Sequence, residues 1–128
     1  MELWDFDGCH QVNQEEDLLK RLQSTRRGLD RAFILSHDGD EALWTHFHGD
    51  AAFLWFLPHN DGKHPGFVPD GMWSGEKVDV RFLQTNGTLA DSIVVPWWQL
   101  VPAGAACRVA VEYLHSPGKP ASVTWFEL

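Results

Sequence analysis

The chain has 128 residues, of which 44% are hydrophobic and 22% charged, so we expect one soluble domain around one core. Its longest apolar run, residues 51–57, is far shorter than the roughly 20 residues that cross a bilayer, which excludes a membrane-spanning helix. The net charge of −8 disfavours binding to nucleic acid or to anionic membranes. Solubility alone explains such an acidic balance, and a basic partner is the more specific interpretation.

The first elements expected along the chain are a short strand at 3–6 and a helix. Asn13 followed by Glu16 indicates a helix N-terminus with a capping-box variant, and Gly28 is expected to end the helix. A narrow apolar stripe predicts that this helix lies on the surface of another layer; its members are Leu18, Leu19 and Leu22. The opening residues show neither a basic start nor a long apolar segment, so we expect no secretory signal and a cytoplasmic location.

Residues 32–57 predict an antiparallel meander. Three apolar runs, at 33–35, 42–48 and 51–57, are separated by turn signals that each contain an Asp beside a Gly. Residues 58–76 hold too many Gly and Pro for a regular element, so we expect a long connection there. Such a segment is more often functional than inert.

Further along, the pattern predicts two strands, a helix and a last strand, at 78–82, 93–95, 102–115 and 123–126. The strands at 78–82 and 93–95 are expected to continue the sheet, joined by a turn at Asn86 and Gly87. Pro102 suits the first turn of the helix, whose apolar face comprises Ala106, Val109, Ala110, Tyr113 and Leu114. The sequence therefore predicts an α+β domain: a mostly antiparallel sheet with two helices packed on one face.

The histidines are the best candidates for enzymatic chemistry. His46 and His48 lie two apart on a predicted strand and therefore share a face, and His59 and His64 follow in the nearby loop. Converging imidazoles are a common zinc arrangement, so a metal-dependent enzyme built on these four residues is the alternative function. The competing interpretation is a solvated polar strand face, because no HExxH or paired CxxC motif accompanies the histidines. Cys9 and Cys107 are expected to be buried or idle thiols.

Seven tryptophans are unusual for a chain of this length. Those within strand patterns are expected in the core; they are Trp4, Trp55 and Trp125. Trp44 fits either sheet face. No periodicity buries the tryptophans of the connections, so they either pin loops to the core or anchor a partner; they are Trp73, Trp97 and Trp98.

The C-terminal third carries a series of structural marks: Val101 and Pro102 opening a helix, Tyr113 and Leu114 near its end, then Gly118, Pro120 and the segment 123–128. This series resembles the signature of the first-numbered immunity-protein family of bacterial polymorphic toxin systems, and the order of elements extends the resemblance over nearly the whole chain. The resemblance implies an inhibitor encoded beside a toxin gene, commonly for a toxin domain similar to nucleic-acid deaminases. It implies no catalytic residue, metal or cofactor.

The hypothesis that follows is a non-enzymatic protein that binds a cognate basic toxin and occludes its active site or substrate groove. Acids steer a basic partner and aromatic side chains supply contact energy, which places the interface in the acidic, aromatic connections. The residues predicted to bind the toxin are Asp61, His64, Asp70, Trp73, Glu76, Trp97 and Trp98. A plain interaction module with some other partner is a further alternative.

Overall fold

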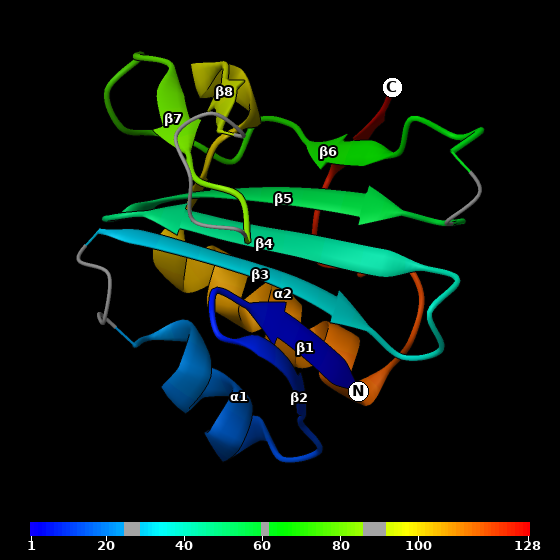
Figure 1. Cartoon of the computed structure of the whole chain (residues 1–128). Helices are drawn as coiled ribbons and strands as arrows, with labels where there is room; N and C mark the ends of the chain where they lie inside the picture. The colour runs from blue at the N-terminus through cyan, green and yellow to red at the C-terminus, as the bar shows by residue number, and fades with distance from the viewer. Residues whose placement is uncertain (25–28, 60–61, 86–91) are drawn as a thin grey trace.

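The computed structural model describes residues 1–24, 29–59, 62–85 and 92–128 (Figure 1). The chain forms an α+β fold with one large, mostly antiparallel sheet, as the sequence predicts. Its elements are β1 (Glu2–Asp5), β2 (Gly8–Gln11), α1 (Glu15–Leu22), β3 (Asp30–Ser36), β4 (Ala42–His48), β5 (Ala51–Leu57), β6 (Phe67–Pro69), β7 (Val80–Phe82), β8 (Ile93–Val95), the 3-10 helix η1 (Trp97–Gln99), β9 (Val101–Pro102), α2 (Ala103–His115) and β10 (Trp125–Glu127).

The strands of the large sheet run in the order β10-β6-β5-β4-β3-β1-β2, and β9 pairs with β5. The predicted meander is confirmed: β4 pairs with β5 along its whole length, from Ala42 opposite Leu57 to His48 opposite Ala51. Gly49 turns the chain between them at a φ of 59°, in the left-handed region that glycine adopts without steric cost. The predicted continuation of this sheet by the strands at 78–82 and 93–95 is wrong, because β7 and β8 pair with each other in a separate two-stranded sheet.

Both helices pack on the same face of the sheet, and α1 packs against α2 (Figure 1). Alternate residues of a strand point to opposite faces, so Leu43 and Phe47 of β4 meet the helices, while Trp44 and His46 point to the opposite face. Tyr113 of α2 and Leu18 of α1 are fully buried in this core. The predicted apolar faces of the two helices are thereby confirmed.

The opposite face of the sheet is covered in part by the β7–β8 pair and by η1. Phe53 of β5 packs with Phe82, Val95 and Leu100 in a second, smaller core. The covering elements lie near one end of β5 (Figure 1). Side chains farther along this face therefore have less protein above them.

The helix boundaries differ from the prediction at α1. Its N-cap is Gln14 and makes no side-chain hydrogen bond, so the capping box is wrong; the Asn13 side chain instead accepts a hydrogen bond from the Met1 amino group at 3.3 Å. The helix ends at Leu22, well before Gly28. Gly28 and the predicted turn at Asn86 and Gly87 lie outside the described residues. Neither described helix has the length and apolar character needed to span a membrane.

Candidate protein-binding surface

Three residues predicted to bind a partner gather where β6 and β10 form an edge of the sheet. His64 precedes β6 and Asp70 follows it. The Trp98 ring meets the Phe126 ring of β10 edge-on, with 5.7 Å between the ring centroids. We call this region the C-terminal edge surface and define it by Asp70, Trp98, Phe126, Glu127 and Leu128.

The C-terminal edge surface exposes apolar and acidic side chains together. Phe126 and Leu128 are 47% and 48% exposed. Asp70 is also exposed. Glu127 leaves 64% of its side chain exposed while pairing with His64 Nε2 at 3.1 Å. Apolar contact area beside exposed carboxylates is the composition suited to a basic protein partner.

The other predicted binding residues are placed differently. Trp73 and Trp97 are half-buried and pack on the second core, and Trp73 Nε1 donates a hydrogen bond to the Glu76 carbonyl at 2.9 Å. Lys77 lies over the Trp97 ring, 5.1 Å from its centroid. The exposed Glu76 belongs to the same stretch of chain, whereas Asp61 lies outside the described residues. These indoles therefore hold the connections against the sheet, and a smaller fraction of each is exposed than of Phe126.

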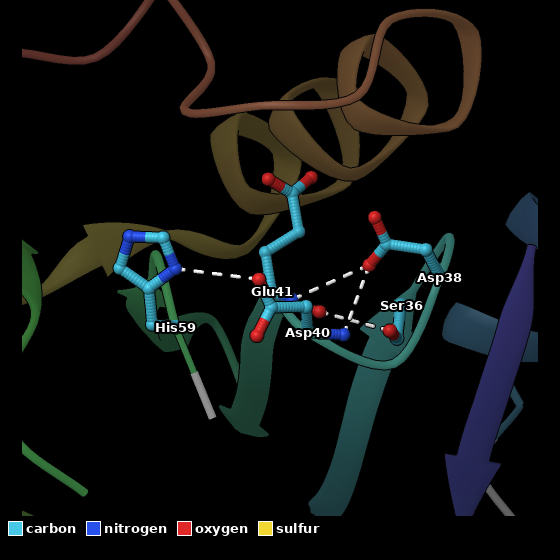
Figure 2. Close-up of polar contacts among 5 residues, drawn as sticks. All are labelled: Ser36, Asp38, Asp40, Glu41 and His59. Atoms are coloured by element: carbon cyan, nitrogen blue, oxygen red, sulfur yellow. Dashed lines mark hydrogen bonds and ion pairs between the residues drawn. The ribbon is translucent and has the colours of Figure 1, made fainter. Parts of the chain in front are cut away.

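The hairpin between β3 and β4 holds a second group of acids, shown in Figure 2. Asp38 Oδ1 accepts a hydrogen bond from the Asp40 main-chain N–H at 2.9 Å, and the main-chain hydrogen bonds of Asp40 and Glu41 lower the pKa of Asp38. Ser36 Oγ donates to the Glu41 carbonyl at 2.8 Å, and Asp40 pairs with His59 Nδ1 at 3.3 Å. The polar groups of this turn are thus used to hold the hairpin in shape.

The Glu41 carboxylate points away from Asp38 and Asp40, toward α2 (Figure 2). It accepts hydrogen bonds from the Tyr113 hydroxyl at 3.1 Å and from the Gly118 main-chain N–H at 2.8 Å. Burial and the adjacent Glu41 charge raise the pKa of Tyr113. His37 Nε2 donates to the Tyr113 carbonyl at 2.6 Å. This network joins the hairpin to the end of α2 and to the segment that leads to β10.

His46 is fully buried, so the interpretation of this strand face as solvated and polar is wrong. Its Nε2 donates to Gln84 Oε1 at 3.1 Å, and its ring stacks on Trp44 at 5.6 Å. Burial lowers the pKa of His46 to about 4. The other three histidines of the predicted metal group each pair with a separate carboxylate: His48 with Asp30, His59 with Asp40 and His64 with Glu127. Within the described ranges, no three His, Cys, Asp or Glu side chains are grouped to hold a metal ion, so the structure does not form the four-histidine site.

A row of large side chains crosses the partly covered face of the sheet. Trp4 lies opposite Ile34, Ile34 opposite Trp44, and Trp44 opposite Trp55. The Trp44 and Trp55 rings pack together, with 5.0 Å between their centroids. Trp4, at the end of the row, is 46% exposed. The expectation that Trp4 belongs to the core is therefore wrong. Trp4 lies on the strand next to the edge strand β2, whereas the described elements that cover this face pack around Phe53 of β5.

A hollow lies beside α1, and no sequence pattern had indicated it. Two cavities of about 140 and 430 Å³ share Asp5, Asp7, Arg21 and Ser24 as lining residues. Arg31 also lines the smaller cavity; its guanidinium lies 4.6 Å from the centroid of the Phe47 ring, and burial lowers its pKa. Acidic and basic side chains both line the hollow, so its charge favours no single class of ligand. Cys9 is exposed and Cys107 is buried, and both are free thiols.

No protein-family model matches the chain, and no curated protein sequence is similar to it.

Proposed function

We propose that this protein is a cytoplasmic immunity protein that binds and neutralises a cognate toxin, through an interface that includes the C-terminal edge surface. The observation that carries the proposal is the exposure of Phe126 and Leu128 at the same edge of the sheet as the exposed acids Asp70 and Glu127. The resemblance of the C-terminal third to the immunity-protein family supplies the class of partner. The order of elements expected from that resemblance is compatible with the described fold.

Charge explains how such a partner is recognised. A toxin domain that acts on nucleic acid must present a positive groove to the phosphate backbone. A protein of net charge −8 is attracted to that groove over a long range, which speeds association. Once bound, the acidic protein occupies the positive groove and thereby excludes the nucleic acid from it. The proposed partner is therefore a nucleic-acid-directed, deaminase-like toxin domain whose active site or substrate groove is blocked.

Apolar contact explains how the complex is held once formed. Exposed ion pairs each contribute little to affinity, whereas a few desolvated aromatic side chains dominate most interfaces. Phe126, supported edge-on by Trp98, is placed to act as such an anchor. The acids of the C-terminal edge surface would then govern the rate of association, and Phe126 the rate of dissociation.

The proposal is tested by isothermal titration of the purified protein with the toxin domain encoded beside its gene. We expect a one-to-one complex with a dissociation constant below about 1 µM, and loss of the deaminase activity of the toxin on adding one equivalent. An unrelated basic protein, lysozyme, serves as a control for binding by charge alone. Absence of binding to the toxin domain, or binding no tighter than to lysozyme, would overturn the proposal.

A further inference from the structure

The pairing of β10 with β6 determines where the main-chain groups of β10 point. The Asp70 N–H donates to the Thr124 carbonyl at 2.9 Å, and the Leu128 N–H donates to the Gly66 carbonyl at 3.0 Å. Antiparallel strands alternate between hydrogen-bonded and non-hydrogen-bonded pairs. Phe126, opposite Val68, is therefore the hydrogen-bonded pair between these two. The N–H and C=O groups of Trp125 and Glu127 consequently point away from β6.

No strand in the described part of the chain lies beyond β10, which ends the strand order of the large sheet. Among the described residues, Trp125 and Glu127 make their other polar contacts through their side chains. Trp125 Nε1 donates to the Pro120 carbonyl, and the Glu127 carboxylate pairs with His64. Two outward N–H groups and two outward C=O groups thus form an open edge. An open edge of this kind is a template for one more strand.

We infer that β10 accepts an extended segment of the toxin as an additional strand of the sheet, an inference that rests on the proposed function. The added strand would hydrogen-bond to the outward groups of Trp125 and Glu127. Its main-chain hydrogen bonds supply affinity, and its alternate side chains supply specificity.

The two sides of β10 define the sequence pattern of the added segment. Phe126 projects to one side of the sheet, next to Trp98, and Glu127 projects to the other. Residues of the added strand that share the side of Phe126 should be apolar. Residues on the side of Glu127 should be Lys or Arg, because opposite charges on neighbouring strands are favourable. The partner segment is therefore an extended stretch in which apolar and basic residues alternate.

A second copy of this chain fits the edge less well than a basic segment. Two paired β10 strands would each carry the acidic Glu127 and would join two chains that each carry a net charge of −8. The charge complementarity that favours a basic strand is thus absent from a β10–β10 dimer.

Two substitutions at Glu127 separate the contribution of main-chain hydrogen bonding to toxin affinity from the contribution of charge. Glu127→Gln removes the charge and keeps the outward N–H, whereas Glu127→Pro removes both and leaves the hydrogen bonds between β10 and β6 in place. By titration with the toxin domain, we expect Glu127→Gln to weaken binding about threefold and Glu127→Pro to weaken it at least about tenfold further. Urea midpoints of both variants report whether the fold is retained.

Amide hydrogen exchange of the wild-type protein gives a second readout that needs no substitution. The amides of Trp125 and Glu127 should exchange at least about tenfold more slowly in the complex than in the free protein. The amide of Cys9, which faces outward on β2 at the opposite edge of the sheet, should be unchanged.

The outcomes distinguish this inference from the proposed function. Failure of the wild-type protein to bind the toxin overturns the proposed function, and the inference falls with it. Tight binding without protection of the Trp125 and Glu127 amides, or with equal affinity of the Gln and Pro variants, overturns only the added strand. A dimer of this chain that is lost on Glu127→Pro would also overturn it, because the edge would then serve self-association.

Discussion

The Tyr113 hydroxyl donates a hydrogen bond to the Glu41 carboxylate at 3.1 Å, although 71 residues separate them in the chain. The same carboxylate accepts the Gly118 main-chain N–H. One side chain of the β3–β4 hairpin therefore holds the end of α2 and the start of the segment that leads to β10. The C-terminal edge surface depends on this join for its position.

Removal of the Glu41 carboxylate should destabilise the protein more than removal of the Tyr113 hydroxyl. Glu41→Ala leaves two buried or half-buried donors without an acceptor, and we expect it to lower the free energy of unfolding by about 2–3 kcal/mol. Tyr113→Phe removes one hydrogen bond, and we expect a loss of about 1–2 kcal/mol. Urea unfolding followed by tryptophan fluorescence measures both. Equal effects of the two variants would show that the Gly118 hydrogen bond contributes nothing.

The buried His46 should make the protein less stable in weak acid. Its pKa is lowered to about 4 in the folded protein, against an ordinary value of about 6.5, so the unfolded chain binds more protons between these two values. Stability contributed by neutral His46 is present above pH 6.5 and is lost as the pH falls toward 4. Between pH 7 and pH 4.5 we expect a loss of about 2–3 kcal/mol from this residue.

His46→Gln is the matched control for this pH dependence, because it removes the titrating group and leaves every other histidine in place. The free energy of unfolding of both proteins is measured at pH 7 and pH 4.5. We expect the pH-induced loss to be smaller in the variant by the amount assigned to His46. A loss of the same size in both proteins would contradict the assignment.

Gly66 should tolerate no side chain. Its φ is 95°, and a Cβ there would lie 2.9 Å from the Phe56 carbonyl oxygen and closer still to the Trp55 indole. Gly66→Ala should cost about 2–4 kcal/mol and disturb the hydrogen bond from Trp55 Nε1 to the Pro65 carbonyl. Gly71 has a φ of 73° with open space around it, so Gly71→Ala should cost only about 1 kcal/mol. Thermal melts compare the two; similar melting temperatures would contradict the close packing at Gly66.

Charge reversal on the exposed acids should slow toxin association without changing stability. The double variant Asp70→Lys, Glu76→Lys replaces two carboxylates that attract the basic toxin with two ammonium groups that repel it. We expect the association rate at low salt to fall by about tenfold, and its dependence on salt to weaken. Stopped-flow measurements at two ionic strengths test this, with Glu16→Lys on α1 as the control. An unchanged association rate would place the interface elsewhere.

Chelation should leave the protein unaffected. Each of the four histidines contacts a different side chain: His46 is hydrogen-bonded to Gln84, and the other three, His48, His59 and His64, pair with separate carboxylates. We therefore expect the melting temperature to be the same with and without excess EDTA, and elemental analysis to find no stoichiometric zinc in the purified protein. A clear fall in melting temperature on adding EDTA would revive the metal-dependent alternative.

The periodic parts of the fold were predictable from the sequence. Apolar runs separated by turns with an Asp beside a Gly indicated the meander of β3, β4 and β5, and the apolar face around Tyr113 indicated α2. These signals are local, so neighbouring residues suffice to define them. Three-residue strands such as β6 carry no such period, and β6 forms only because β5 and β10 lie on either side of it.

The candidate site was less predictable, because side-chain exposure depends on which elements cover a face. The two-residue spacing of His46 and His48 correctly placed both on one face, but Gln84 and Trp44 bury His46. Trp4 and Phe126 belong to strand patterns that normally indicate core residues, yet both are exposed because their strands lie at or near the edges of the sheet. The exposure of these side chains depends on the order of the strands and on what covers them, and no local sequence pattern gives either.

The register between β5 and β6 consists of one residue pair, Phe56 opposite Phe67, whereas β4 and β5 share seven. The ribbon formed by β6 and β10 can therefore detach from the sheet by breaking few main-chain hydrogen bonds, while the meander stays intact. Opening of this ribbon should require less free energy than global unfolding. The region proposed to bind the toxin can thus adjust its angle to a partner more readily than the meander can.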